Sequence, residues 1–162
     1  MTIRKPRELT QGMPPSARVL GLDLGTRTIG LALSDVGRTI ATPFDTIRRT
    51  KLKLDIAHLT QIISEQGVGA LVLGLPINMN GSEGPRCQAT RQFAADLLKT
   101  IDIPLAFWDE RLSSHAAEEA LLEADVSRKR RAELIDKVAA AVILQGCLDF
   151  LSFGGVDGSD PG

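Results

Sequence analysis

The chain has 162 residues, of which 43% are hydrophobic, and a formal net charge of −1 at pH 7. This length and composition suit one compact domain with a single core. A near-neutral chain has no overall positive field, so contact with a polyanion has to use local basic patches. No apolar run approaches the length of a membrane span, and the polar segment 1–16 lacks the apolar stretch of a signal peptide. We therefore expect a soluble cytoplasmic protein without membrane contact.

The first element along the chain is a predicted β-hairpin within residues 18–35. Two short apolar runs flank a Gly-Thr-Arg-Thr turn, which is typical of a hairpin. Asp23 lies near the end of its first strand among apolar neighbours, where a carboxylate is costly unless it is paired, hydrogen-bonded or bound to a metal. The alternative to a functional role is that Asp23 accepts hydrogen bonds from the turn amides of Gly25 and Thr26.

The rest of the chain first continues the meander and then alternates strands with helices. Continuous apolar runs indicate buried strands, apolar residues at helical spacing indicate helices, and Gly67 is a natural C-terminal cap of the first helix. We expect residues 18–151 to form the domain, between flexible tails at 1–17 and 152–162. The expected elements are strands over 38–43, 70–75 and 103–108 and helices over 52–66, from Pro85 to Ile101, over 113–123 and around 135–143, with 128–131 in a polar loop.

This order of elements predicts an α/β fold with one mixed sheet flanked by helices. The later crossovers are expected to be right-handed and their strands parallel. Ligands on such sheets lie beyond the carboxyl ends of the parallel strands. Asp23 and the neighbouring Asp109 and Glu110 all come at such ends.

A third carboxylate, Asp136, lies one residue from the apolar stripe of the last helix, beside small alanines. Taken singly, Glu110 fits a surface turn held by salt bridges, and Asp136 fits a solvated position near a helix start. Together with Asp23 they would crowd three like charges at one sheet edge, which is unfavourable unless a cation joins them. Clustered oxygen ligands without His or Cys favour Mg²⁺ or Mn²⁺ over zinc.

Four motifs stand in order along the chain: Gly21–Gly30, Val72–Pro76 with Asn80–Ser82, Asp109–Ser113, and Asp136 before an alanine-rich helix. Together they resemble the YqgF family, a bacterial branch of the ribonuclease H-like superfamily related to the RuvC Holliday-junction resolvases. The resemblance runs from about residue 18 to residue 150. It implies a ribonuclease H-like sheet of five strands, the first three antiparallel and two more parallel to the first.

The resemblance also implies a divalent-metal nuclease that hydrolyses phosphodiester bonds in 5′-end maturation of pre-16S ribosomal RNA, with Holliday-junction resolution as the alternative. By position, the family's catalytic and metal-binding acids fall on Asp23, Glu110 and Asp136. RuvC-type resolvases carry a second acid one helical turn after the helix aspartate, and here that position is Ala139. This departure favours pre-ribosomal RNA over branched DNA as the nucleic-acid partner. The protein itself is expected to be a monomer or a homodimer.

Basic and turn-forming residues near these acids are candidates for nucleic-acid contact. The densest basic run, 128–131, precedes Asp136, and the glycine- and asparagine-rich segment 76–85 leads into a helix whose amides could hold a phosphate. A solvated charged face and a plain connecting loop are the respective alternatives. With no tyrosine and 4% aromatic residues, backbone recognition is expected rather than base stacking. The candidates are Arg27, Asn80, Ser82, Arg111, Arg128, Lys129, Arg130 and Arg131.

Two other functional classes share part of this pattern. The Asp-Leu-Gly-Thr-Arg-Thr stretch at residues 23–28 also resembles the first phosphate loop of actin-like ATPases and sugar kinases. Those proteins clasp a nucleotide between two such domains, and this chain has the length for one. The other class is a non-catalytic RNA-binding or assembly factor that keeps the fold.

Overall fold

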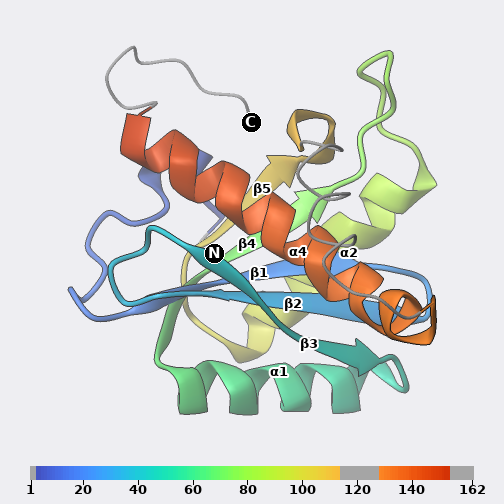
Figure 1. Ribbon diagram of the computed structural model, residues 1–162, viewed down its shortest axis with the longest axis horizontal. Helices are drawn as coiled ribbons and strands as arrows, with labels where there is room; N and C mark the ends of the chain where they lie inside the picture. The colour runs from blue at the N-terminus through green and yellow to red at the C-terminus, as the bar shows by residue number, and fades with distance from the viewer. Residues whose placement is uncertain (1–2, 114–127, 154–162) are drawn as a thin grey trace.

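The computed structural model describes residues 3–113 and 128–153, and the side chains of the last helix from Ile135 onward. A five-stranded sheet of order β3-β2-β1-β4-β5 forms its centre (Figure 1). The elements are η1 (Pro6–Glu8), β1 (Arg18–Leu24), β2 (Thr28–Ser34), β3 (Ala41–Arg48), α1 (Leu52–Gln66), β4 (Val68–Leu75), α2 (Pro85–Thr100), β5 (Leu105–Asp109), η2 (Glu110–Leu112) and α4 (Arg128–Phe153).

The sheet has the predicted mixed topology. Strand β2 pairs antiparallel with both β1 and β3, whereas β4 pairs parallel with both β1 and β5. The expected five-stranded, ribonuclease H-like arrangement is therefore confirmed. Because β1 is the central strand, its carboxyl end at Asp23 lies between the hairpin turn on one side and the end of β4 on the other.

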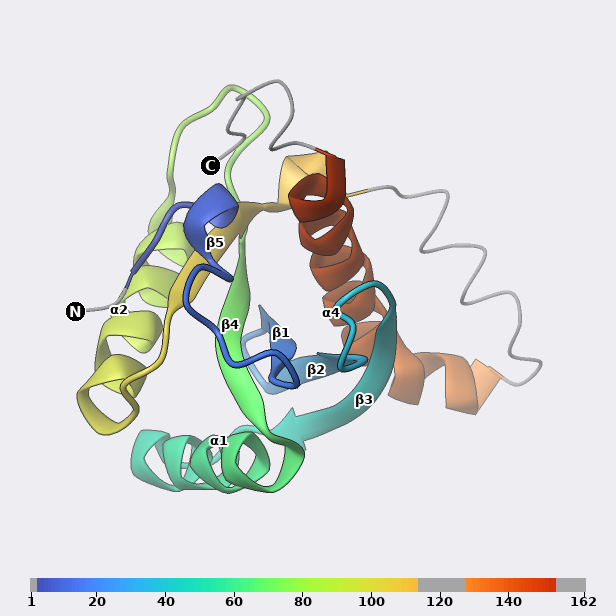
Figure 2. The same cartoon turned by 90° about the vertical axis from the view of Figure 1, so that its left-hand side faces the viewer.

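The helices cover the two faces of the sheet unequally. Helices α1 and α2 lie on one face and α4 crosses the other (Figure 2). The α1 and α2 face is filled mainly by leucine and isoleucine side chains, including Leu22, Leu71 and Leu73. On the α4 face the strands present smaller residues, among them Ala32 and Ala70, to the buried residues of the helix.

The ends of α1 show how local sequence sets the element boundaries. Its C-cap Gly67 has a φ of 65°, and the Gly67 amide donates to the Ile63 carbonyl. This left-handed position favours glycine, which has no Cβ to clash. The predicted cap is thus confirmed, and it turns the chain directly into β4.

The third strand differs from its prediction, which placed it over 38–43 and ended it at a proline. The strand runs from Ala41 to Arg48, and Pro43 lies inside it. Proline is tolerated there because β3 is an edge strand, with β2 as its single neighbour. On an edge strand, every second backbone amide points away from the partner strand, so a proline at such a position loses no hydrogen bond. The β2–β3 register also shifts between Leu31 and Ala32.

The segment 1–17 is predicted to be a flexible tail, and in the structure its residues 3–17 pack against the domain. Leu9 is fully buried in the α4-side core, and the Arg4 amide donates to the Leu105 carbonyl at 2.8 Å. The Arg4 guanidinium also donates to the carbonyls of Glu8 and Gln11. The Arg4 amide ties the segment to β5, Leu9 anchors it in the core, and the Arg4 side chain holds the segment's own turns, although its polar composition conceals this.

The region before Asp136 also departs from the prediction. Residues 128–131, expected in a loop, form the first turn of α4, and the helix continues into the expected C-terminal tail as far as Phe153. Ile135, placed on the apolar stripe, is 44% exposed. The helix expected over 113–123 lies almost wholly outside the described residues. Among the helices that are described, none combines the length and apolarity needed to cross a membrane.

Candidate active site

The carboxyl ends of β1 and β5 place two carboxylates next to each other. Asp23 is the penultimate residue of β1, and its antiparallel partner on β2 is Gly30. Glu110 begins η2 directly after β5. Its side chain reaches back over β4, close to Gly74. A Cβ built on Gly74 would lie 2.7 Å from Glu110 Oε1.

Asp23 and Glu110 interact directly. The two side chains share a hydrogen bond, and burial, followed by the charge of Glu110, raises the pKa of Asp23 to about 7. Asp136 contributes a smaller rise to this pKa, and the Arg86 guanidinium opposes it. Two carboxyl groups can share a hydrogen bond only when one is protonated, so this pair carries a proton below about neutral pH.

Asp136 approaches the pair from α4 but has a partner of its own. Thr28 Oγ1 at the start of β2 donates to Asp136 Oδ2 at 2.7 Å. Asp136 is close enough to act electrostatically on Asp23, yet no three His, Cys, Asp or Glu side chains in the described ranges form a ready-made metal cluster. The structure therefore joins Asp23 to Glu110 and holds Asp136 beside them.

Glycines on the sheet, which have no side chain, allow α4 to approach this closely. A Cβ at Gly30 would lie 2.0 Å from the Asp136 carbonyl oxygen, and one at Gly21 would lie 2.8 Å from Leu144 Cβ. At Gly74 it would meet Ile143 Cδ1 at 2.6 Å. At Gly30 and Gly21 the helix backbone or a Cβ fills the space, so these two glycines set how deeply the helix carrying Asp136 sits on the sheet, whereas at Gly74 the ends of rotatable side chains would have to move.

The alternative that Asp23 accepts turn amides does not describe this hairpin. The Gly25 amide donates to the Thr28 carbonyl at 2.8 Å. The turn is held from outside by Arg49, whose Nη1 donates to the Gly25 carbonyl at 2.7 Å. Among the causes that shift the pKa of Asp23, none is a backbone hydrogen bond.

The salt-bridged turn considered for residues 109–111 exists, but Glu110 is outside it. Arg111 Nη2 donates to Asp109 Oδ2 at 2.7 Å, and the Arg111 amide and Nε donate to the same carboxylate. The hydrogen bonds from the Arg111 side chain lower the pKa of Asp109. Arg111, predicted to bind nucleic acid, is thus bound to Asp109, which fixes the turn that presents Glu110.

The other predicted nucleic-acid contacts occupy three places. Asn80 Oδ1 accepts from the amide and hydroxyl of Ser82, so these two exposed side chains shape the β4–α2 loop. Arg27 is exposed in the hairpin turn. Residues 128–131 form the first turn of α4, and their side chains fall outside the described set.

Sequence reasoning missed two residues that bear on the carboxylates. Thr28 holds Asp136, and Arg86 at the start of α2 acts on Asp23. A signal existed for both. Thr28 closes the same Gly-Thr-Arg-Thr turn that drew attention to Asp23, and Arg86 opens the helix after the loop predicted to hold phosphate.

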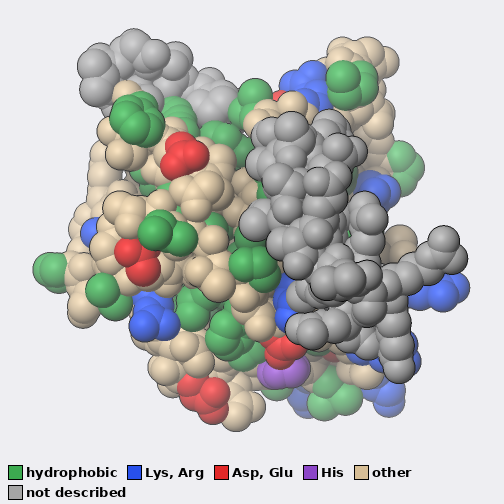
Figure 3. All heavy atoms as spheres, viewed as in Figure 1, with side chains coloured by type: hydrophobic (Ala, Val, Ile, Leu, Met, Phe, Trp, Pro, Cys, Tyr) green, Lys and Arg blue, Asp and Glu red, His purple; other side chains and the backbone are tan. Residues whose placement is uncertain are grey.

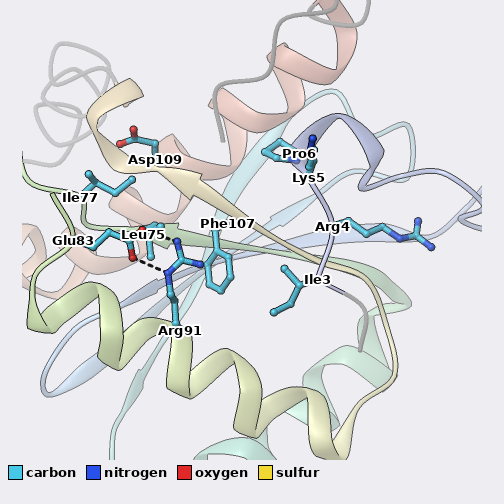
Figure 4. Close-up of a pocket in the computed structure, with 10 residues that line it drawn as sticks. All are labelled: Ile3, Arg4, Lys5, Pro6, Leu75, Ile77, Glu83, Arg91, Phe107 and Asp109. Atoms are coloured by element: carbon cyan, nitrogen blue, oxygen red, sulfur yellow. Dashed lines mark hydrogen bonds and ion pairs between the residues drawn. The ribbon is translucent and has the colours of Figure 1, made fainter. Parts of the chain in front are cut away.

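A pocket of about 430 Å³ lies away from these carboxylates, between the N-terminal segment, β5 and α2 (Figure 4). Its floor includes Phe107, covered by the Arg91 guanidinium at 4.9 Å. Arg91 also donates to both carboxylate oxygens of Glu83, and the pocket's other carboxylate, Asp109, is bound to Arg111. The pocket is lined by none of the three candidate acids.

Comparison with known proteins identifies the family. The sequence matches the family described as RuvX, Holliday junction resolvase, over residues 17–150. The chain belongs to the RuvX/YqgF family. It is 62% identical over 149 residues to a protein of Paramagnetospirillum magneticum, covering 92% of this chain and 96% of the relative. It is 57% identical over 151 residues to one of Roseobacter denitrificans, covering 92% and 93%. Both relatives are named, provisionally, pre-16S rRNA nucleases.

Solved structures confirm the fold of this RuvX/YqgF chain. Thermus thermophilus RuvC in complex with a Holliday junction substrate superposes with a TM-score of 0.56 at 12% identity, covering 90% of this chain and 98% of RuvC. The yeast mitochondrial Holliday junction resolvase gives 0.53 at 13% identity, covering 91% and 84%. At these identities the likeness establishes the shared ribonuclease H-like fold alone.

Proposed function

We propose that the chain is a divalent-metal-dependent nuclease that hydrolyses phosphodiester bonds of pre-16S ribosomal RNA in the maturation of its 5′ end. The observation that carries the proposal is the hydrogen-bonded pair Asp23 and Glu110, with Asp136 beside it. The substrate is taken from the names of the relatives, which share about 60% of their residues with this chain over nearly its whole length.

The donor set fits Mg²⁺ or Mn²⁺. All three groups are carboxylates, the hard oxygen ligands that these ions prefer. Burial first, and then the negative charges of Glu110 and Asp136, raise the pKa of Asp23, and a bound cation would favour the charged carboxylate against both effects. Asp23 and Glu110 would hold the ion together, and Asp136 would join from its position against Thr28.

The chain's own residues prepare this site for hydrolysis. Ions bound between carboxylates in this way can activate a water and stabilise the leaving oxygen of a phosphodiester. Asp23 has to lose the proton it shares with Glu110 before both can act as ligands. Thr28 keeps the Asp136 carboxylate oriented, and Gly30 lets the backbone of α4 come close enough for that hydrogen bond.

Cleavage of a four-way DNA junction is the second candidate, because the description of the matching family is Holliday junction resolvase. Ala139 argues against it. A carboxylate one helical turn after Asp136 is part of the RuvC-type pattern, and here a methyl group stands in its place.

The test offers the protein a pre-16S RNA transcript with its 5′ extension and a four-way DNA junction side by side, each with Mn²⁺ or Mg²⁺. We expect cleavage of the RNA that stops on chelation and is abolished in Asp23→Asn, Glu110→Gln and Asp136→Asn. Circular dichroism checks that each variant is folded. Near-normal turnover in any one of them removes that residue from the site, and cleavage of the junction alone replaces the proposed substrate.

A further inference from the structure

Three exposed arginines lie at the sheet edge that carries Asp23. Arg27 is in the turn between β1 and β2, Arg48 is the last residue of β3, and Arg86 is in the first turn of α2. In the space-filling view, Lys and Arg side chains gather on the side where the hairpin turn, the end of β3 and the start of α2 lie in Figure 1 (Figure 3). The net charge of −1 therefore hides a local positive edge.

Arg48 lies on the same face of the sheet as the carboxylates. Its antiparallel partner is Thr28, and side chains of directly opposed residues project to the same face. Thr28 faces α4, since its hydroxyl donates to Asp136. The next pair along, Ile29 and Ile47, is buried in the core under α1 and α2, as the alternation of a strand requires.

Arg27 is held in position by its neighbours. The Arg49 amide donates to the Arg27 carbonyl at 2.8 Å, and the Arg49 side chain donates to the carbonyl of Gly25. The turn is therefore fastened to the end of β3, and the Arg27 side chain is exposed.

Arg86 stands on the opposite side of Asp23. It follows the loop at the end of β4, the strand that pairs with β1 on the side away from β2. Its positive charge is felt at Asp23. Its backbone is fixed because Thr90 Oγ1 donates to the Arg86 carbonyl at 2.9 Å.

The side chains of these three arginines make no hydrogen bond or ion pair with the described residues, which distinguishes them from Arg49, Arg91 and Arg111. Arg49, Arg91 and Arg111 are each committed to a protein acceptor. A guanidinium with no protein partner beside an anionic reaction centre is suited to a phosphate, which it binds through several donors at once.

We propose that Arg48 and Arg86, together with Arg27, bind backbone phosphates of one polynucleotide strand on the two sides of the Asp23 carboxylate. Strands β3 and β4 are separated by β2 and β1, which puts these two strands about 14 Å apart, with Arg48 at the end of β3 and Arg86 beyond the end of β4. A strand that reaches both ends has to cross the carboxylates. The inference rests on the proposed nuclease function, because it states how the same site holds its substrate.

The test measures binding of a short fluorescein-labelled RNA strand, and of a DNA strand of the same sequence, by anisotropy over a series of salt concentrations. All variants are made on the Asp23→Asn background in Mg²⁺, so that the strand stays intact. We expect Arg48→Ala and Arg86→Ala each to weaken binding roughly five- to tenfold and to lower the slope of log Kd against log salt by about 0.7. The decrease in slope should be equal on RNA and DNA.

Two further variants keep the result interpretable. Arg48→Lys should restore the salt slope, because it keeps the charge. Arg18→Ala, which removes an arginine at the opposite end of β1, should change neither affinity nor slope. Unchanged slopes in both Arg48→Ala and Arg86→Ala, an equal loss in Arg18→Ala, or a loss confined to RNA would overturn the proposal. Arginine-dependent binding without cleavage by the unmodified protein would instead refute the nuclease function alone.

Discussion

The two faces of the sheet are built from side chains of different size. Under α1 and α2 the strands present leucines and isoleucines, such as Leu22, Leu71 and Leu73, all of them almost or fully buried. Under α4 most of the alternate positions carry smaller residues, including Ala70 and Gly74, and Trp108 of β5 is the large exception. One face thus supplies most of the apolar burial, and the other lets a helix backbone come close.

This difference explains where the carboxylates can be placed. Large side chains keep a helix at a distance from a sheet, whereas glycine lets the Asp136 backbone touch the strand at Gly30. Asp23, on the small-residue face, then meets Glu110, which directly follows β5, and faces Asp136 from α4. We infer that the large-residue face determines mainly stability, and that the small-residue face determines mainly activity.

The largest loss of stability is expected from a cavity on the large-residue face. Leu73→Ala removes a fully buried side chain and should lower the free energy of unfolding by about 2–5 kcal/mol. Cleavage measured well below the melting temperature should stay close to that of the unmodified protein. Denaturant unfolding and a rate assay on the same sample check both. A folded Leu73→Ala protein without cleavage would show that the two faces do not act separately.

A smaller loss of stability, with loss of cleavage, is expected from Gly30→Ala. The added methyl group would lie 2.0 Å from the Asp136 carbonyl oxygen, so the helix backbone has to move. Overpacking of this kind costs about 1–3 kcal/mol. Gly67→Ala is the matched control, because it strains a φ of 65° where nothing lies within 4 Å of the new Cβ. It should lose stability and keep cleavage; equal cleavage in the two variants would contradict the account.

The smallest change in stability is expected from Gly74→Ala. Its methyl group would meet Glu110 Oε1 at 2.7 Å and Ile143 Cδ1 at 2.6 Å, both ends of side chains that can rotate. The free energy of unfolding should fall by about 1 kcal/mol or less, while cleavage falls more than about tenfold because Glu110 leaves Asp23. Thermal melts and cleavage rates decide this, and normal cleavage would mean that Glu110 need not contact Asp23.

Much of the fold could be predicted from sequence because its signals are local. The apolar run at 70–75, the helical spacing in 52–66 and the cap Gly67 each depend on a few neighbouring residues. The end of the third strand was predicted wrongly at Pro43, because the effect of a proline depends on whether its strand lies at a sheet edge. The order of the strands in the sheet decides this. The packing of the N-terminal segment could not be predicted from its polar composition, because one buried residue, Leu9, anchors it.

The proximity of the three acids could be predicted from the sequence, and their contacts less so. Asp23 and Glu110 stand out because each comes at the end of an apolar run. The hydrogen bond between Thr28 and Asp136 joins residues 108 positions apart, and no spacing rule reports it. The glycines at 30 and 74 could be read as turn or strand residues in the sequence, and their role follows only from where α4 lies.

Unfolding of the metal-free protein tests most directly whether Asp23 belongs to a carboxylate cluster that binds a cation. Asp23 has a pKa of about 7 in the folded protein, against an ordinary value of 3.8. The folded state therefore holds this proton more tightly, and its contribution to stability is present below about pH 4 and lost as the pH rises through about 7. The loss amounts to about 4 kcal/mol at most.

The measurement is the free energy of unfolding of the unmodified protein and of Asp23→Asn, without metal, at about pH 5 and about pH 8, followed by the melting temperature with added Mn²⁺. We predict that the unmodified protein loses stability between the two pH values, and that Asp23→Asn lacks this loss and is at least as stable at about pH 8. Mn²⁺ should raise the melting temperature of the unmodified protein far more than that of the variant. A less stable Asp23→Asn with an undiminished Mn²⁺ response would contradict the account.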